Sequence, residues 1–415
     1  MDTARVVRAL EADEAMISLM AGSPGPETLR DCKEILLKAT SNVLDQDADT
    51  SHLFRYGHDK GDHDFCDQLA SFLTQEYGDE VKSSNLMVTA GATQALHLMA
   101  TMLFGKDTVV FIEDPTYFAA ARMLSQDLQM NVISVPCDED GMDCEELDRL
   151  LTAKRPAQSA SSSNPLRPFW ALVYTITVYN NPTGRCYNPN RCRKLVELAR
   201  KHDVMILAED VYNLIHFGDG HPPPRLLSYD RRSDPDYKGH VVSSATFSKI
   251  LAPGLRLGWV EAPERILTLL HGSNMAWSGG SLNHYASKLA GAILELGLQT
   301  QHLRLLRQIY KKRCDAVCEI LRDNLPPGCK FEKPQGGFFI WIEFPEDVDT
   351  FKMVQFIAKE YKVSFFPGVS CSGLGHCTNC ARLSFSFYQE DVLCKAMKTF
   401  CAGAKAFISM SQTSG

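Results

Sequence analysis

Short apolar runs alternate with amphipathic stretches through the first two thirds of the chain. Helices are predicted over 92–100, which consists of strong helix formers, and over 191–202, where apolar residues gather on one side. From 169 to 210 the order is strand, turn, helix and strand, which implies a crossover connection and therefore a parallel sheet. Buried strands are predicted over 85–91, 109–118, 169–179, 204–210 and 241–247.

The last third of the chain has a different pattern. Long helical periodicity runs from 283 to 325 and stops at Pro326-Pro327-Gly328. Shorter strands are predicted over 334–342, 363–368 and 381–386. Two segments are predicted to be surface excursions, the Ser-rich, low-complexity insertion over 153–168 and the Pro- and charge-rich stretch over 218–239.

Composition narrows the class of protein. A chain of 415 residues, 45% hydrophobic and 22% charged, suits a globular protein of two domains with a large core. The net charge of −7 and the lack of a long Lys/Arg run argue against a nucleic-acid partner. No stretch has 18 uninterrupted apolar residues, and the start has no signal-like core, so neither a membrane nor secretion is expected. Fourteen scattered cysteines indicate a reducing cytoplasm.

The stretch from 246 to 256, TFSKILAPGLR, carries distinctive chemistry. Lys249 follows an apolar strand, and a lysine in such surroundings shifts toward its neutral form, which condenses with aldehydes. Thr246, Ser248 and Arg256 offer hydroxyl groups and a positive charge that suit a phosphate. An aldehyde joined to a phosphate describes pyridoxal 5'-phosphate (PLP). Taken alone, the stretch also fits a surface loop with a solvated lysine.

Two strand ends offer further binding groups. At Gly91 a predicted strand meets a helix, so free backbone N–H groups and the positive end of the helix point to one spot that suits a phosphate. Asp210 ends a strongly apolar strand, where a carboxylate needs a cation such as a protonated pyridine nitrogen. Asn181 and Asp210 both fall beyond strand ends, where parallel sheets bind ligands. The alternatives are an ordinary turn at Gly91 and a loop-capping carboxylate at Asp210.

Five motifs occur in one order along the chain: GATQAL (91–96), NPTG (181–184), the strand-end Asp210, SKILAPGLR (248–256) and RLSFS (382–386). As a set they resemble the class I and II aminotransferases, which are PLP enzymes of fold type I, and in particular the aminoadipate, kynurenine and aromatic group. The resemblance runs from about residue 15 to the C-terminus. It implies a large α/β domain over 45–280, with a mixed, mostly parallel sheet flanked by helices. A smaller α+β domain would combine 1–44 with 281–415.

The resemblance also assigns roles to residues. Lys249 would hold PLP as a Schiff base and then act as an acid and base at the substrate. Tyr117 would stack on the ring and Asp210 would pair with its nitrogen, although Asp210-Val211-Tyr212 is one residue shorter than the family's D-x-x-Y. Asn181 and Tyr212 would contact the phenolate oxygen. The phosphate would be held by Gly91, Ala92, Thr93, Thr246, Ser248 and Arg256.

Three more residues complete the implied site. Arg382 would bind the α-carboxylate of the amino acid, with Asn181 nearby, and Gly22 would contact the substrate through its backbone. Tyr56 would reach across a homodimer interface to the partner's cofactor phosphate. A structural ion pair is the alternative role of Arg382.

The function predicted from this resemblance is transfer of an amino group between an L-amino acid and a 2-oxo acid, with 2-oxoglutarate as acceptor. A carbon–sulfur β-lyase and a non-catalytic PLP-binding protein are the alternatives. The loop that holds Cys371, His376, Cys377 and Cys380 has spacing that a metal could use, but reduced surface cysteines are the preferred interpretation, so no metal is predicted.

Overall fold

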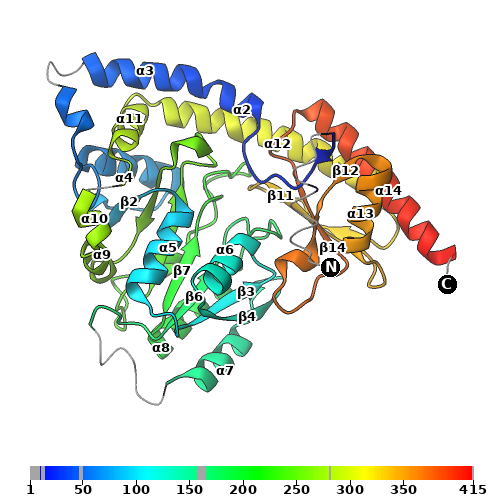
Figure 1. Ribbon diagram of the computed structural model, residues 1–415, viewed down its shortest axis with the longest axis horizontal. Coiled ribbons are helices and arrows are strands. Elements are labelled where there is room, and N and C mark those ends of the chain that lie inside the picture. Colours follow the sequence, from blue (N-terminus) through cyan, green and yellow to red (C-terminus); the bar gives the residue numbers. More distant parts are fainter. Residues whose placement is uncertain (1–9, 11–14, 46–49, 157–164, 280–281, 414–415) are drawn as a thin grey trace.

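The computed structural model describes residues 10, 15–45, 50–156, 165–279 and 282–413 (Figure 1). Residues 157–164, the centre of the insertion predicted over 153–168, lie outside this description. The described strands form sheets of eight, four and two strands. In the described part of the chain, no helix has the length and apolar character needed to cross a membrane.

The eight-stranded sheet carries the carboxyl ends at which the site lies. Neighbours from β4 through β3, β6 and β7 to β8 pair in parallel, whereas β2, β5 and β9 pair antiparallel. The predicted α/β fold with a mixed, mostly parallel sheet is therefore confirmed. In spatial order the strands are β2 (Leu86–Thr89), β9 (Gly258–Glu261), β8 (Val241–Thr246), β7 (Met205–Glu209), β6 (Ala171–Thr175), β3 (Val109–Asp114), β4 (Asn131–Asp138) and β5 (Gly141–Met142).

Both faces of this sheet are covered by helices, which explains why strands such as β2 and β6 are buried along their whole length. Alternate side chains enter two cores: Val110 and Ile112 of β3 pack into one, and Phe111 packs into the other. The first core includes residues of α5 (Ala92–Leu103), α6 (Phe118–Arg122) and α9 (Glu264–His271). The second includes residues of α7 (Cys144–Lys154) and α8 (Pro189–His202).

The C-terminal part of the chain builds a second, antiparallel sheet in the order β10 (Lys330–Phe331), β11 (Phe339–Glu343), β14 (Cys380–Ser384) and β13 (Phe366–Pro367). It is accompanied by α13 (Thr350–Tyr361) and α14 (Glu390–Thr413). The N-terminal strand β1 (Ile17–Ser18) pairs with β12 (Val363–Ser364), so the N-terminal segment joins the C-terminal part of the chain. The division at residues 45 and 280 stays a prediction.

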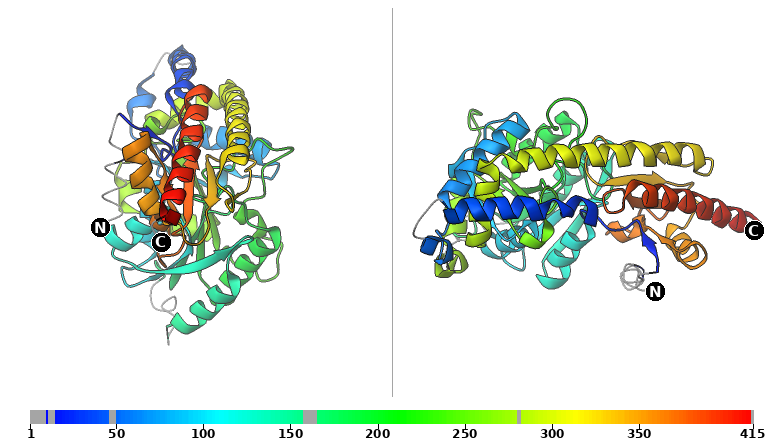
Figure 2. Two further views of the ribbon diagram at one scale, coloured as in Figure 1. Left: turned by 90° about the vertical axis from the view of Figure 1, so that its right-hand side faces the viewer. Right: turned by 90° about the horizontal axis from the view of Figure 1, so that it is seen from above.

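A long helix, α12 (Leu298–Asn324), runs from one sheet to the other, as the views in Figure 2 show. Near its start Gln299 donates to the Ile250 carbonyl at 2.9 Å, and further along Arg313 donates to the Ser386 carbonyl at 2.5 Å. The helical pattern predicted over 283–325 is interrupted at Gly297, whose φ of +68° separates α11 (His284–Glu295) from α12. Other α-helices within the described residues are α2 (Pro26–Arg30), α3 (Cys32–Asp45), α4 (His63–Tyr77) and α10 (Asn274–Gly279).

One buried carboxylate joins the two sheets close to the site. Asp114, at the end of β3, is 3% exposed and accepts from the Ser372 hydroxyl at 2.7 Å. It also accepts from the backbone N–H groups of Gly373 at 2.6 Å and Leu374 at 3.1 Å. Because these partners precede β14, Asp114 fixes the second sheet against the first.

We expect Asp114→Ala to lower the free energy of unfolding by about 2–4 kcal/mol, because three donors lose their buried acceptor. Urea unfolding followed by circular dichroism measures the change. The matched control is Asp347→Ala, which removes an exposed carboxylate. Equal midpoints for the two variants would show that the Asp114 contacts do not hold the sheets together.

Candidate active site

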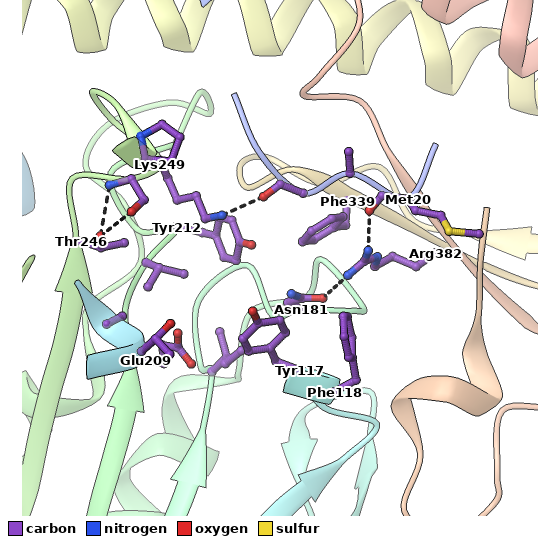
Figure 3. A pocket seen from close by; sticks show the side chains of 18 of the residues that line it. Met20, Tyr117, Phe118, Asn181, Glu209, Tyr212, Thr246, Lys249, Phe339 and Arg382 are labelled. Atoms are coloured by element: carbon purple, nitrogen blue, oxygen red, sulfur yellow. Dashed lines mark hydrogen bonds between the residues drawn. The ribbon is translucent and has the colours of Figure 1, made fainter. Parts of the chain in front are cut away.

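A cavity of about 290 Å³ lies where the carboxyl ends of the parallel strands face the second sheet. This is where parallel α/β sheets bind ligands. Figure 3 shows side chains from segments far apart in the sequence pointing into it. The residues that line it include Met20, Gly22, Ala92, Thr93, Tyr117, Phe118, Asn181, Glu209, Tyr212, Thr246, Ser248, Lys249, Arg256, Phe339 and Arg382.

Lys249 lies just beyond β8 and points into the cavity (Figure 3). Its Nζ donates to the Gly22 carbonyl at 2.7 Å. Burial lowers the pKa of Lys249 from 10.5 to about 8, and the charges of Arg382 and Arg256 act in the same direction against the attraction of Glu209. Near neutral pH the amine therefore has a far larger neutral fraction than an ordinary lysine, and the neutral amine is the form that attacks an aldehyde.

One end of the cavity is equipped for an anion. Helix α5 begins after Gly91, whose φ of +88° favours glycine, and a Cβ there would lie 3.0 Å from Arg256 Nη2. The hydroxyls of Thr246 and Ser248 lie 2.9 Å apart, and Arg256 Nη1 donates to Ser248 Oγ at 3.4 Å. A helix N-terminus, two hydroxyls and a guanidinium thus converge as a phosphate site requires.

The other end of the cavity holds Arg382, which comes from β14 and is 3% exposed. Its Nη1 donates to Asn181 Oδ1 at 2.8 Å and its Nη2 donates to the Met20 carbonyl at 2.6 Å. The guanidinium carbon lies 4.2 Å from the ring centre of Phe339 and 4.5 Å from that of Phe366. These contacts fix the plane of the guanidinium group, which is what recognition of a carboxylate by two parallel hydrogen bonds demands.

Gly22 faces the same space and leaves no room for a side chain. A Cβ at this position would lie 2.5 Å from the Phe339 ring. The Gly22 carbonyl accepts from Lys249 Nζ, and the predicted backbone contact of Gly22 with the substrate stays a prediction. Phe339 was not among the residues predicted from the sequence, because the apolar run 338–342 indicates a buried strand and does not say which ring reaches a cavity.

Two tyrosines complete the walls. Tyr117 precedes α6, and burial raises its pKa to about 12, with the charge of Glu209 acting in the same direction. Tyr212 also lines the cavity, and its ring centre lies 5.8 Å from Lys249 Nζ. The short spacing between Asp210 and Tyr212 therefore does not keep Tyr212 away from the lysine.

The structure differs from the sequence prediction at Asp210, which is 2% exposed and does not line the cavity. Its carboxylate accepts from the Ser243 hydroxyl at 2.5 Å and from Asn213 Nδ2 at 3.1 Å. Burial raises the pKa of Asp210 against these two bonds and the charge of Arg225. The preceding residue, Glu209, lines the cavity instead (Figure 3).

Strand alternation explains this difference. Along β7, Met205 and Leu207 pack into the core shared with α5, whereas Ile206 and Ala208 pack into the opposite core. The same alternation turns Glu209 toward the α5 side, where the cavity lies, and Asp210 away from it. Counting residues along the strand could have found Glu209; the apolar character of the strand alone could not.

Two other predictions concern groups outside this cavity. Tyr56 is 85% exposed and does not line the cavity of its own chain. Within the described residues, no group of three or more His, Cys, Asp or Glu side chains is placed to hold a metal ion.

The sheet is mostly parallel, and its cavity holds a lysine of lowered pKa between groups that suit a phosphate and an arginine that suits a carboxylate. This arrangement is that of the transferases of fold type I. The family model for aminotransferases of class I and II matches residues 15–399. The chain belongs to that family and is a PLP-dependent transaminase.

Known relatives agree with this membership. The aromatic-amino-acid aminotransferase 1 of Thermococcus litoralis is 29% identical, with 92% of this chain and 86% of the relative covered. The crystal structure of a multiple substrate aminotransferase from Thermococcus profundus aligns with a TM-score of 0.84 at 28% identity, covering 99% of this chain and 96% of the other. The kynurenine aminotransferase of Pyrococcus horikoshii, solved in complex with PMP, gives 0.81 at 28% identity, with coverages of 98% and 94%.

The lowered pKa of Lys249 predicts its reactivity. In cofactor-free protein, reductive methylation of Lys249 with formaldehyde should increase with pH and level off above about 8, because the neutral amine is the reacting form. Exposed lysines, with an ordinary pKa of about 10.4, should keep gaining reactivity beyond that point. Peptide mass spectrometry measures both in one sample. A Lys249 profile that follows the exposed lysines up to pH 10 would contradict the lowered pKa.

Proposed function

We propose that this transaminase holds PLP at Lys249 and moves an amino group from an L-amino acid to a 2-oxo acid, with 2-oxoglutarate as an acceptor. The observation that carries the proposal is that two groups line the same cavity. One is the amine of Lys249, whose pKa is lowered, and the other is the guanidinium of Arg382, whose orientation is fixed by its hydrogen bonds. An amine of this kind suits an aldehyde, and a guanidinium of this kind suits the carboxylate that amino acids and 2-oxo acids share.

The residues present fit the cofactor. Thr246, Ser248, Arg256 and the N-terminus of α5 at Ala92 and Thr93 would bind its phosphate, and Gly91 leaves the space for it. Tyr117 would pack against the face of the ring. When bound, the ring supplies an electron sink for the substrate's Cα.

Asn181 and Tyr212 would bind the ring's phenolate oxygen. Asn181 Oδ1 accepts from Arg382, and the amide nitrogen of Asn181, which also interacts with the Tyr212 hydroxyl, would donate to the cofactor. Asn181 therefore connects Arg382, the residue that would bind the substrate, to the cofactor site. Tyr212, on the lysine side, would donate its hydroxyl.

Arg382 and Lys249 would have different roles toward the substrate. Arg382 would hold the α-carboxylate in its planar fork while Phe118 and Phe339 shield the substrate from water. Lys249, once released from the cofactor, would take and return the proton at Cα. The Gly22 carbonyl, which accepts from the same amine, would help to keep it in reach.

We also propose that the active unit is a homodimer in which Tyr56 completes the phosphate site of the partner subunit. Tyr56 and Phe54 are exposed, at 85% and 71%, and the Phe54 ring stacks on the half-exposed Tyr285 with ring centres 5.9 Å apart. These rings place apolar surface on the outside of the chain, which association with a second copy would bury.

We expect the purified enzyme, supplied with PLP, an aromatic amino acid and 2-oxoglutarate, to form glutamate. Lys249→Ala should abolish the reaction, and borohydride should fix the cofactor to Lys249 in the parent protein. Arg382→Lys should raise KM for donor and acceptor together by about tenfold or more, because a lysine cannot form the paired hydrogen bonds. Coupled assay of glutamate measures these effects.

Arg149→Lys serves as the matched control, because Arg149 pairs with Glu146 on the surface. A β-lyase would instead release ammonia and a 2-oxo acid from a cysteine conjugate without an acceptor. A protein that takes up no PLP, or one that binds it without converting any donor, would refute the proposed function.

Mixed dimers test the role of Tyr56. Subunits with Tyr56→Ala and subunits with Lys249→Ala are each expected to be inactive, but their hybrid has one intact site. Equal mixing and exchange should therefore restore about a quarter of the wild-type activity. Mixing Lys249→Ala with Arg256→Ala is the control, since both residues line their own chain's cavity and no hybrid site is intact. Equal recovery in both mixtures, or an active monomer by light scattering, would contradict the shared site.

A further inference from the structure

We propose that Glu209, and not Asp210, is the carboxylate that pairs with the protonated ring nitrogen of the cofactor, and that Tyr174 positions it. The proposal rests on the proposed function, since it concerns PLP in the same cavity. The role of pairing with the ring nitrogen thereby moves from Asp210 to its neighbour Glu209.

The first support is the placement of Glu209. It ends β7 and lines the cavity on the side of α5, which carries the phosphate-type end. In Figure 3 it lies across the cavity floor, on the same side as Tyr117. A ring that stacks on Tyr117, with its phosphate at α5 and its aldehyde at Lys249, has its nitrogen edge toward the strand ends, where Glu209 is the carboxylate that the cavity offers.

The second support is electrostatic. Burial raises the pKa of Glu209, opposed by a hydrogen bond from Tyr174 and by the charge of Lys249. When Lys249 condenses with an aldehyde, its amine no longer provides a free ammonium group for Glu209. A buried carboxylate then needs another cation, and a protonated ring nitrogen provides one in the same cavity.

Tyr174 holds Glu209 from the neighbouring strand. Its hydroxyl donates to Glu209 Oε2. The parallel pairing of Tyr174 with Leu207 sets the two side chains on the same face of the sheet, two residues apart. With Oε2 occupied by this donor, Oε1 is assigned to the ring nitrogen.

Asp210 is engaged elsewhere. Ser243 and Asn213 donate to its two oxygens on the far side of the sheet edge, and it lies outside the cavity lining. The bond from Ser243 connects the end of β7 to β8, the strand that leads to Lys249, and the bond from Asn213 fixes the loop that follows β7. Asp210 is therefore a positioning residue for the strand ends.

The test uses PLP labelled with ¹⁵N in its ring, bound to full-length protein, because the ¹⁵N chemical shift reports whether the nitrogen is protonated. In Glu209→Gln we expect the shift of a neutral ring nitrogen, weaker PLP binding and a kcat lower by about 10²–10³-fold. Glu209→Asp, which keeps the charge, should keep the nitrogen protonated. Asp210→Asn, the matched control, should keep the wild-type ¹⁵N shift, and its lost contacts should lower the melting temperature.

Circular dichroism establishes that each variant is folded. If Glu209→Gln does not fold, Tyr174→Phe replaces it: loss of the donor to Glu209 should move the ¹⁵N shift, whereas pairing with Asp210 would leave it unchanged. A neutral ring nitrogen in Asp210→Asn with a protonated one in Glu209→Gln overturns the assignment. Wild-type protein that takes up no PLP at Lys249 refutes the proposed function itself, which is a separate result.

Discussion

The structure depends on keeping one amine, Lys249 Nζ, out of water. Desolvation is the largest contribution to its lowered pKa, and Arg382 and Arg256 reinforce it from the two ends of the cavity. The Gly22 carbonyl accepts from the amine, so the N-terminal segment covers it. A solvated lysine at this position would have a much smaller neutral fraction at neutral pH and would attack an aldehyde more slowly.

Shielding that amine from water requires the two sheets to keep a fixed position relative to each other. The lysine and the phosphate-type end belong to the eight-stranded sheet, whereas Arg382 and Phe339 belong to the four-stranded one. Asp114 and helix α12 cross between them. A change in how the sheets pack would therefore alter both the solvation of the lysine and the distance from it to the arginine.

The charges along the cavity follow a simple order. Arg256 lies beside Ser248 and Gly91, whereas Arg382 lies beside Asn181. Lys249 and Glu209 line the same cavity. The two arginines suit anions that a ligand brings, namely a phosphate and a carboxylate. The buried carboxylate suits a positive charge located on the ligand between those anions. The charges of the cavity thus complement a cofactor and a substrate that together carry a phosphate, a carboxylate and one positive charge. The aromatic walls strengthen each of these interactions by excluding water.

Local pattern determined most of the elements: β2, β3, β7 and β8 lie where apolar runs predicted strands, and α5 and α8 lie where helices were predicted. The spacing of the lysine motif likewise brought Thr246, Ser248, Lys249 and Arg256 into one cavity. Strand alternation could also have indicated that Glu209 faces the cavity. Tertiary structure alone decided that Gly22 covers Lys249 and that the Phe339 and Phe366 rings both contact Arg382. The reason is that the residues of a segment indicate whether it is buried and which of its side chains share a face, whereas contacts between segments far apart in the sequence depend on how whole sheets pack.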